Sequence, residues 1–130
     1  LDRVADQAAV KRETAYFEAN IGKVKSADDF VANSRLFNYA MKAFGQLAQA
    51  SMAEGAVSAR NKELIALAIG ITQHCSGCIG FHVKALRRLG ASRAELEEML
   101  AVCVYMGGGP ALMYAAEALK AWDSFEPPAA

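Results

Sequence analysis

Apolar residues along the chain recur mostly at steps of three and four, the spacing that places them on one face of an α-helix. No stretch shows the sustained alternation of apolar and polar residues, bounded by turn residues, that is typical of a half-buried strand. The pattern therefore predicts an all-α protein, a compact helical domain of about six helices.

Two of these helices are predicted in the N-terminal part of the chain. The first spans about Asp2 to Ala19, and the sequence Asn20 to Gly22 stops it. The second follows a capping sequence, Ser26 to Asp29, and carries apolar residues at helical steps. These residues are Phe30, Phe37, Met41, Phe44 and Leu47. We expect the face that they form to lie in the core.

Two further helices are predicted in the middle of the chain. Ser58 can cap a third helix, which runs from Ala59 to about Gln73. The centre of this helix, Leu64 to Ile71, is apolar all round, which predicts a central position in the fold. A fourth helix runs from Cys75 to Leu89 and is ended by Gly90.

The last two helices are separated by a run of glycines. Ser92 and Glu95 form a capping box that opens a fifth helix, from Arg93 to Met106. The sequence Gly107 to Gly109 breaks the chain, and Pro110 suits the first turn of a last helix. We interpret the glycines and the proline as a tight helix-to-helix turn.

Length and composition limit the classes of protein to consider. A chain of 130 residues has the size of one domain, and we assign residues 1–130 to a single helical domain. Lys plus Arg and Asp plus Glu number 14 each, with no segment of one sign, so neither a nucleic-acid nor a membrane partner is expected. The hydrophobic content of 54% exceeds what a small monomer needs for its core, which favours a homo-oligomer.

The sequence also carries signals about location. The longest unbroken apolar stretch, Leu64 to Ile71, is far shorter than the roughly 20 residues that cross a bilayer, which predicts no transmembrane helix. No basic region followed by an apolar stretch opens the sequence, so we expect a cytoplasmic location. Three cysteines, two of them close together, do not fit the disulfide framework of a secreted protein.

The segment with the most chemical content is Cys75-Ser-Gly-Cys78-Ile-Gly-Phe-His82. On a helix, at about 100° per residue, Cys75, Cys78 and His82 lie within an arc of roughly 60°. Residues three apart in a helical turn have Cα atoms within the roughly 4.4 to 6.8 Å window of a disulfide, so this pair could open and close with little backbone motion. Gly77 and Gly80 are poor helix formers, which suggests a close approach by backbone, substrate or a neighbouring helix.

A thiol must lose its proton before it can attack, and a helix N-terminus alone is too weak to achieve this. The helix end stabilises an anion by about 0.3 to 1 kcal/mol, whereas one pKa unit corresponds to about 1.4 kcal/mol. His82, one turn after Cys78, is the nearest base. Glu63 is the candidate carboxylate, because it lies at the edge of the most apolar helix, where burial would make it a useful general base. The alternative for Glu63 is a solvated side chain that complements the helix dipole.

Glu63, eleven intervening residues, Cys75-x-x-Cys78 and x-x-x-His82, all in helical context, resemble the core of the alkylhydroperoxidase AhpD-like branch of the carboxymuconolactone decarboxylase family. The resemblance covers at least Val57 to Phe125. It implies that Cys78 is the peroxidatic thiolate, Cys75 the resolving thiol, His82 the proton relay and Glu63 the base reached through His82 or a water. It also implies an AhpD-like helical fold assembled into a homotrimer or homohexamer.

The activity that the resemblance implies is a thiol-dependent peroxidase, an antioxidant oxidoreductase that acts on hydrogen peroxide or organic hydroperoxides. A dithiol or a protein-bound lipoyl group would be the reductant, and we expect no cofactor and no metal. Some family members with peroxidase roles carry a histidine between the cysteines, where this chain has Ser76 and Gly77, and His74 lies just outside the pair. The decarboxylase branch lacks the cysteine pair, so lactone decarboxylation is disfavoured.

Other functions fit the same residues. A thiol–disulfide exchange or redox-sensing protein would use Cys75 and Cys78 without peroxide. A zinc-binding module would add His82 and either His74 or Glu63, although no second Cys/His pair completes a tetrahedral site. A purely structural role, with two buried reduced cysteines and a core histidine, is the remaining alternative.

Several residues outside this segment are interpreted as packing residues. Cys103 lies in an apolar run and is predicted to be a small core residue. Tyr105, Met106, Met113 and Tyr114 sit at helical spacings and are interpreted as core or subunit contacts, and Tyr114 could also line a pocket.

Overall fold

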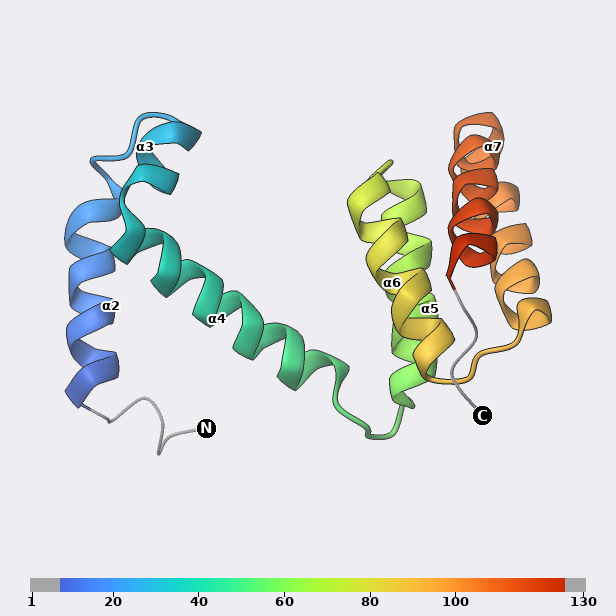
Figure 1. Cartoon of the computed structure of the whole chain (residues 1–130), viewed down its shortest axis with the longest axis horizontal. Coiled ribbons are helices and arrows are strands. Elements are labelled where there is room, and N and C mark those ends of the chain that lie inside the picture. Colours follow the sequence, from blue (N-terminus) through green and yellow to red (C-terminus); the bar gives the residue numbers. More distant parts are fainter. Residues whose placement is uncertain (1–7, 126–130) are drawn as a thin grey trace. The chain divides into compact units, whose positions relative to one another are not determined.

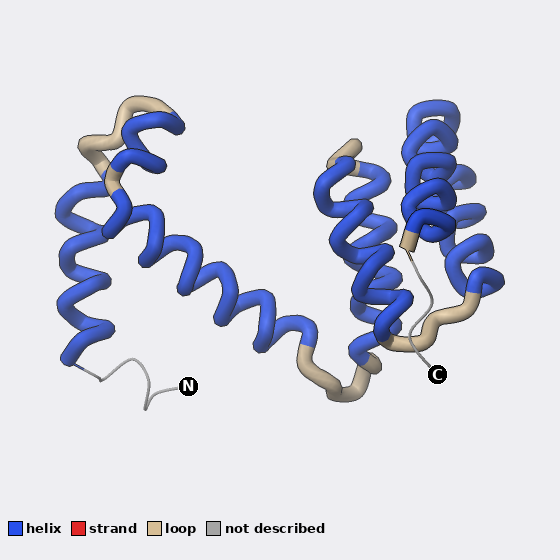
Figure 2. The backbone as a smooth tube through the Cα atoms, viewed as in Figure 1, coloured by secondary structure: helices blue, strands red, loops and turns tan. Residues whose placement is uncertain are grey.

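The computed structural model describes residues 8–125, and its regular structure within this range is entirely helical (Figures 1 and 2). The helices are α2 (Ala8–Ile21), α3 (Ala27–Ala32), α4 (Ser34–Met52), α5 (Ala59–Thr72), α6 (Ser76–Arg88) and α7 (Arg93–Ser124). The all-α prediction is therefore confirmed. The predicted start of the first helix, at Asp2, lies outside the described residues.

The chain divides into two compact units between Ser51 and Met52. The first unit contains α2, α3 and all but the last residue of α4, and the second contains α5, α6 and α7. That residues 1–130 form one domain stays a prediction.

In the first unit, the single helix predicted after Ser26 is two helices. Ser26 caps α3 as expected, because its hydroxyl accepts a hydrogen bond from the Asp29 N–H at 3.0 Å. Asn33 then interrupts the helix, and its side-chain oxygen accepts a hydrogen bond from the Leu36 N–H at 3.1 Å. This side chain therefore satisfies a backbone donor at the start of α4 and opens a new helix there.

The prediction that the apolar face of this segment lies in the core is wrong for its second half. Met41, Phe44 and Leu47 are 49%, 64% and 63% exposed. α2 instead contacts α4 through Tyr39, whose ring lies 4.9 Å from that of Phe17 and whose hydroxyl lies 2.8 Å from that of Thr14. The apolar stripe of α4 therefore lies outside the contacts that α2 makes with α4 in the first unit.

In the second unit, α5, α6 and α7 pack around one hydrophobic core. Its members from α5 and α6 are Leu67, Ile71, Ile79, Val83 and Leu86, and those from the following residues are Ala91, Leu96, Leu100, Cys103, Ala111, Ala115, Ala118 and Trp122. Ser58 caps α5, as predicted. The predicted central position of α5 is only half right, since Leu67 and Ile71 are fully buried whereas Ile65 and Ile69 are more than half exposed.

α7 is folded back on itself at Gly108, as the predicted glycine turn requires (Figure 1). Ser92 and Glu95 form the predicted capping box, and hydrogen bonds from Ser92 hold the pKa of the Glu95 carboxyl below its usual value. Arg93 at the start of α7 binds Asp123 near its end, so the two arms run antiparallel.

The range of α7 is long and apolar enough to cross a membrane by length and composition, the one described helix with that property. Gly108 divides it, however, into arms from Arg93 to Gly107 and from Gly109 to Ser124. Each arm is shorter than the roughly 20 residues that a membrane-spanning helix needs.

The turn in α7 provides a test of the fold. Gly108 has φ 63° and ψ −149°, a backbone region that is essentially restricted to glycine. An added Cβ would meet no other atom within 4 Å, so Gly108→Ala imposes backbone strain without a clash. We expect the free energy of unfolding to fall by about 1 to 3 kcal/mol, measured by chemical denaturation.

Gly109→Ala is the matched control for this substitution. It also has open space around its added Cβ, but it needs no positive φ. Alanine is the better helix former, so the control should leave stability unchanged or raise it by up to about 1 kcal/mol. Equal losses of stability in the two variants would contradict the strained turn.

Candidate functional site

The predicted site begins at the short junction between α5 and α6. His74, two residues after the end of α5, has a left-handed backbone conformation with φ 56°. The His74 N–H donates to the Ile71 carbonyl at 3.1 Å, and the Cys75 N–H donates to the Gly70 carbonyl at 2.9 Å. These are the two hydrogen bonds of a Schellman motif, which satisfies the last carbonyls of a helix. Cys75 is therefore part of the structure that ends α5.

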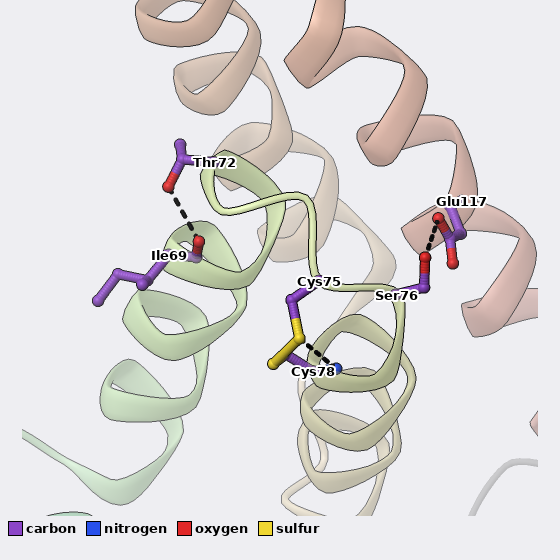
Figure 3. The surroundings of a disulfide bond; sticks show 6 residues. All are labelled: Ile69, Thr72, Cys75, Ser76, Cys78 and Glu117. Carbon is purple, nitrogen blue, oxygen red and sulfur yellow. Dashed lines mark hydrogen bonds between the residues drawn. A yellow bond between two sulfur atoms is a disulfide. The ribbon is translucent and has the colours of Figure 1, made fainter. Parts of the chain in front are cut away.

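Cys75 also begins α6. It is the N-cap residue, and its sulfur accepts a hydrogen bond from the Cys78 N–H at 3.3 Å. A disulfide joins Cys75 and Cys78, whose Cα atoms are 5.2 Å apart (Figure 3). The expectation that two cysteines three residues apart can bridge within one helical turn is thus met.

α5 lies close to this turn at Gly70, which is buried. A Cβ built on Gly70 would lie 3.2 Å from the Cys78 Cβ, so a larger residue there would press on the cysteine. Of the close approaches suggested for Gly77 and Gly80, those by backbone or by a neighbouring helix are not found, because an added Cβ at either position meets nothing within 4 Å in the described part of the chain. Gly70 is instead a glycine at which two helices approach each other closely. The approach of a substrate to Gly77 and Gly80 stays a prediction.

Glu63 and His82 meet between α5 and α6. His82 Nδ1 lies 2.6 Å from Glu63 Oε2, and the two side chains are 20% and 11% exposed. The alternative of a solvated Glu63 is therefore wrong. A buried carboxylate is costly unless it is hydrogen-bonded, and His82 supplies that bond. The predicted site residues thus form two pairs, joined through α6 by the single helical turn between Cys78 and His82.

The other predicted residues fall into different places. Cys103 is buried at 3% exposure, as predicted, and burial raises the pKa of its thiol. His74 is exposed, and its ring stacks on that of Tyr114 with centroids 4.6 Å apart. Tyr105, Met106 and Met113 are exposed, so their interpretation as core residues is wrong, while their role in subunit contacts stays a prediction.

Two residues beside the disulfide were not predicted. One is Gly70, for which a glycine inside an otherwise apolar helix was the available signal. The other is Glu117 of α7, whose Oε2 accepts a hydrogen bond from the Ser76 hydroxyl at 3.1 Å (Figure 3). Ser76 and Glu117 are 41 residues apart, and no local pattern pairs them.

The geometry does not favour a metal centre. Over residues 8–125 no group of three or more His, Cys, Asp or Glu side chains is placed to hold a metal ion. Cys75 and Cys78 are joined to each other, and the His82 ring is bonded to a carboxylate on the neighbouring helix.

Comparison with known proteins points to one family. Residues 39–121 match the carboxymuconolactone decarboxylase family. The chain is 41% identical to an uncharacterized protein of Cupriavidus necator, over 65% of this chain and 75% of that protein. It is 37% identical to uncharacterized protein 4 in the cox locus of Paracoccus denitrificans, over 65% of this chain and 76% of that protein.

A solved structure extends this likeness to the fold. The crystal structure of apo-lpg0406, a carboxymuconolactone decarboxylase family protein from Legionella pneumophila, matches with a TM-score of 0.68 and 42% identity. The match covers 85% of this chain and 95% of that chain.

The different environments of the three cysteines give a test by thiol counting. In the oxidised, folded protein we expect no rapid labelling at neutral pH, because Cys103 is buried and its raised pKa keeps it protonated. Unfolding without reductant should make one thiol available for alkylation, and unfolding after reduction should make all three thiols available. Mass spectrometry after alkylation measures each count.

The variant Cys103→Ser is the control and should release no thiol on unfolding without reductant. Rapid labelling of Cys103 in the folded wild type would contradict the burial described above.

Proposed function

Because the chain belongs to the carboxymuconolactone decarboxylase family, which includes AhpD-like peroxidases, we propose that it is a thiol-dependent peroxidase. Its substrate would be hydrogen peroxide or an organic hydroperoxide. One observation carries the proposal: the buried Glu63–His82 hydrogen bond lies one helical turn from a cysteine pair that can form a disulfide. A base held in place beside an oxidisable thiol is what this chemistry requires.

In the proposed first step, the Cys78 thiolate attacks one oxygen of the peroxide. An S–O bond forms, the O–O bond breaks, and two electrons pass from sulfur to the leaving oxygen, which takes a proton and departs as an alcohol or water. The product on the protein is a Cys78 sulfenic acid.

In the second step, the Cys75 sulfur attacks this sulfenic sulfur. An S–S bond forms and the S–O bond breaks. The departing hydroxide combines with the Cys75 proton to give water.

His82 and Glu63 are the proposed proton path. The helix N-terminus at Cys75 contributes about 0.3 to 1 kcal/mol to an anion, too little to activate a thiol by itself. His82 on the next turn of α6 would take the Cys78 proton directly or through a water, and Glu63 would hold the ring in the orientation needed. The leaving oxygen can receive the same proton.

A dithiol closes the proposed cycle. It supplies two electrons and two protons, restores the Cys75 and Cys78 thiols and becomes a disulfide itself. A lipoyl group on a partner protein has this chemistry. Such a reductant is available in a reducing compartment, and we therefore propose that the protein works in the cytoplasm.

A peroxide-consumption assay with a dithiol reductant tests the proposal. Cys78→Ser should abolish turnover. Cys75→Ser, treated with peroxide in the absence of the dithiol, should consume one equivalent and stop with a sulfenic acid trapped on Cys78. Glu63→Gln should lower kcat/KM by about 100-fold or more, the typical weight of general acid–base catalysis. Hydrogen peroxide and cumene hydroperoxide are the two substrates to compare.

Cys103→Ser is the matched control, since it makes the same chemical change at the buried cysteine outside the pair. It should retain turnover. Turnover that survives Cys78→Ser would rule out the mechanism. Slow reaction with both peroxides, together with rapid reduction of a partner disulfide, would assign the site to thiol–disulfide exchange instead.

We also propose that the protein assembles into a homotrimer or homohexamer through apolar surface that a single chain leaves exposed. The α4 stripe of Met41, Phe44 and Leu47 is one such surface. Phe44→Asp should reduce the mass in solution, measured by size-exclusion chromatography with light scattering, because a charge would be buried in the interface. Gln49→Asp, at an exposed polar position of α4, should leave the mass unchanged. A wild-type protein that runs as a monomer would contradict the assembly.

A further inference from the structure

Both neighbours of Cys75 in the sequence are bound by one face of α7. On the N-terminal side, the His74 ring stacks on Tyr114, with centroids 4.6 Å apart and planes 14° from parallel. On the C-terminal side, the Ser76 hydroxyl donates to Glu117 at 3.1 Å (Figure 3). Tyr114 and Glu117 are three residues apart in the second arm of α7, so their side chains lie on the same face of the helix.

His74 has a left-handed backbone conformation, which is unusual for a residue other than glycine. A left-handed residue that ends a helix is usually glycine, because a Cβ makes this conformation unfavourable. His74 is the one non-glycine residue of the described chain with a positive φ, at 56°. Glycine would end α5 equally well, but it has no ring to stack on Tyr114. Strain of this kind persists only where other contacts hold it, and here it stands next to a redox-active residue.

Figure 3 shows on which side of the junction these contacts lie relative to the disulfide. The Ser76 side chain points toward Glu117, whereas the sulfur atoms of Cys75 and Cys78 point to the other side, where Ile69 and Thr72 of α5 are drawn. The contacts with α7 thus involve the two residues that flank Cys75 and lie on a different side of the junction from the sulfur atoms.

We propose that Tyr114 and Glu117 are positioning residues that hold Cys75 within reach of Cys78 when the pair is reduced. The inference rests on the proposed dithiol/disulfide cycle and adds to it the residues that speed formation of the Cys75–Cys78 disulfide. In the reduced protein no S–S bond links the two side chains. Without the contacts to α7, Cys75 would then gain conformational freedom. Restricting that freedom favours the disulfide, since less entropy is lost when the S–S bond forms.

The consequence concerns the fate of the Cys78 sulfenic acid. Attack by Cys75 on the sulfenic sulfur releases water and gives the disulfide. Attack by a second peroxide instead transfers another oxygen to Cys78, releases the alcohol and gives a sulfinic acid, which a dithiol does not reduce. A well-placed Cys75 makes disulfide formation faster than oxidation to the sulfinic acid.

The first experiment measures the equilibrium between the protein dithiol and oxidised dithiothreitol, which needs no peroxide. Glu117→Ala should lower the constant for forming the protein disulfide by up to about fivefold, the weight of one ordinary hydrogen bond that is lost when Cys75 moves away from Cys78. This equals a rise of up to about 20 mV in reduction potential. Glu117→Gln keeps an oxygen that accepts the Ser76 proton and should restore the wild-type value. The double variant Ser76→Ala/Glu117→Ala should match Glu117→Ala alone, because both substitutions remove the same bond.

The second experiment separates positioning from stability at His74. His74→Gly relieves the left-handed strain, so its thermal unfolding midpoint should equal or exceed that of the wild type. The same variant loses the ring on Tyr114 and should still form the disulfide less readily, by a few-fold. A purely structural role for His74 would move stability and the redox equilibrium in the same direction, and that result would overturn the proposal.

Glu98→Ala is the matched control, an exposed glutamate in the other arm of α7. It should leave the redox equilibrium unchanged. Equal constants for Glu117→Ala and Glu98→Ala would overturn the positioning role while leaving the peroxidase proposal intact. A wild-type pair that dithiothreitol cannot reduce in the folded protein would defeat the proposed cycle itself, and the positioning role with it.

Discussion

The hydrogen bond from the Cys75 N–H to the Gly70 carbonyl is the interaction on which the site depends. It ends α5, and because Cys75 is also the N-cap of α6, it fixes where the next helix begins. Without a flexible linker between them, the two helices must pack side by side, and the absence of a side chain at Gly70 allows Cys78 to approach. The cysteine pair is thus held by the backbone of the junction as well as by its own sulfur atoms.

The second constraint is the buried Glu63–His82 pair. A carboxylate at the edge of a hydrophobic core is tolerated because the histidine lies 2.6 Å away, and removal of either partner would leave the other with an unpaired polar group. The pair also links α5 and α6 across 19 residues of sequence. The packing that buries Leu67 against the core therefore holds a proton acceptor one turn from Cys78. Structural and proposed chemical roles coincide in the same contact.

The features that could be predicted from the sequence are those that depend on residues close together in the chain. Caps and turns depend on neighbours a few residues away, and Ser58, the Ser92–Glu95 box and the break at Gly108 were all predicted from local patterns. The burial of Glu63 was not settled by such patterns, because a glutamate near a helix start is equally compatible with water, and its pairing with His82 came from the family resemblance. Glu117 could not be found at all, since its partner lies 41 residues away. The exposure of Ile69 shows the same limit, because an all-apolar segment does not reveal which of its faces other elements will cover.

The two cysteines, although only three residues apart, are held by different parts of the fold. Cys78 packs against the backbone of α5 and shares a helix face with His82, so changes in α5 act on the environment of its sulfur. Cys75 lies in the junction, and its neighbours His74 and Ser76 are bound by α7. In the proposed mechanism α5 would therefore act on the thiolate at Cys78, while α7 would limit the movement of Cys75. A three-helix arrangement around a short junction is enough to let sequence changes tune these two properties separately.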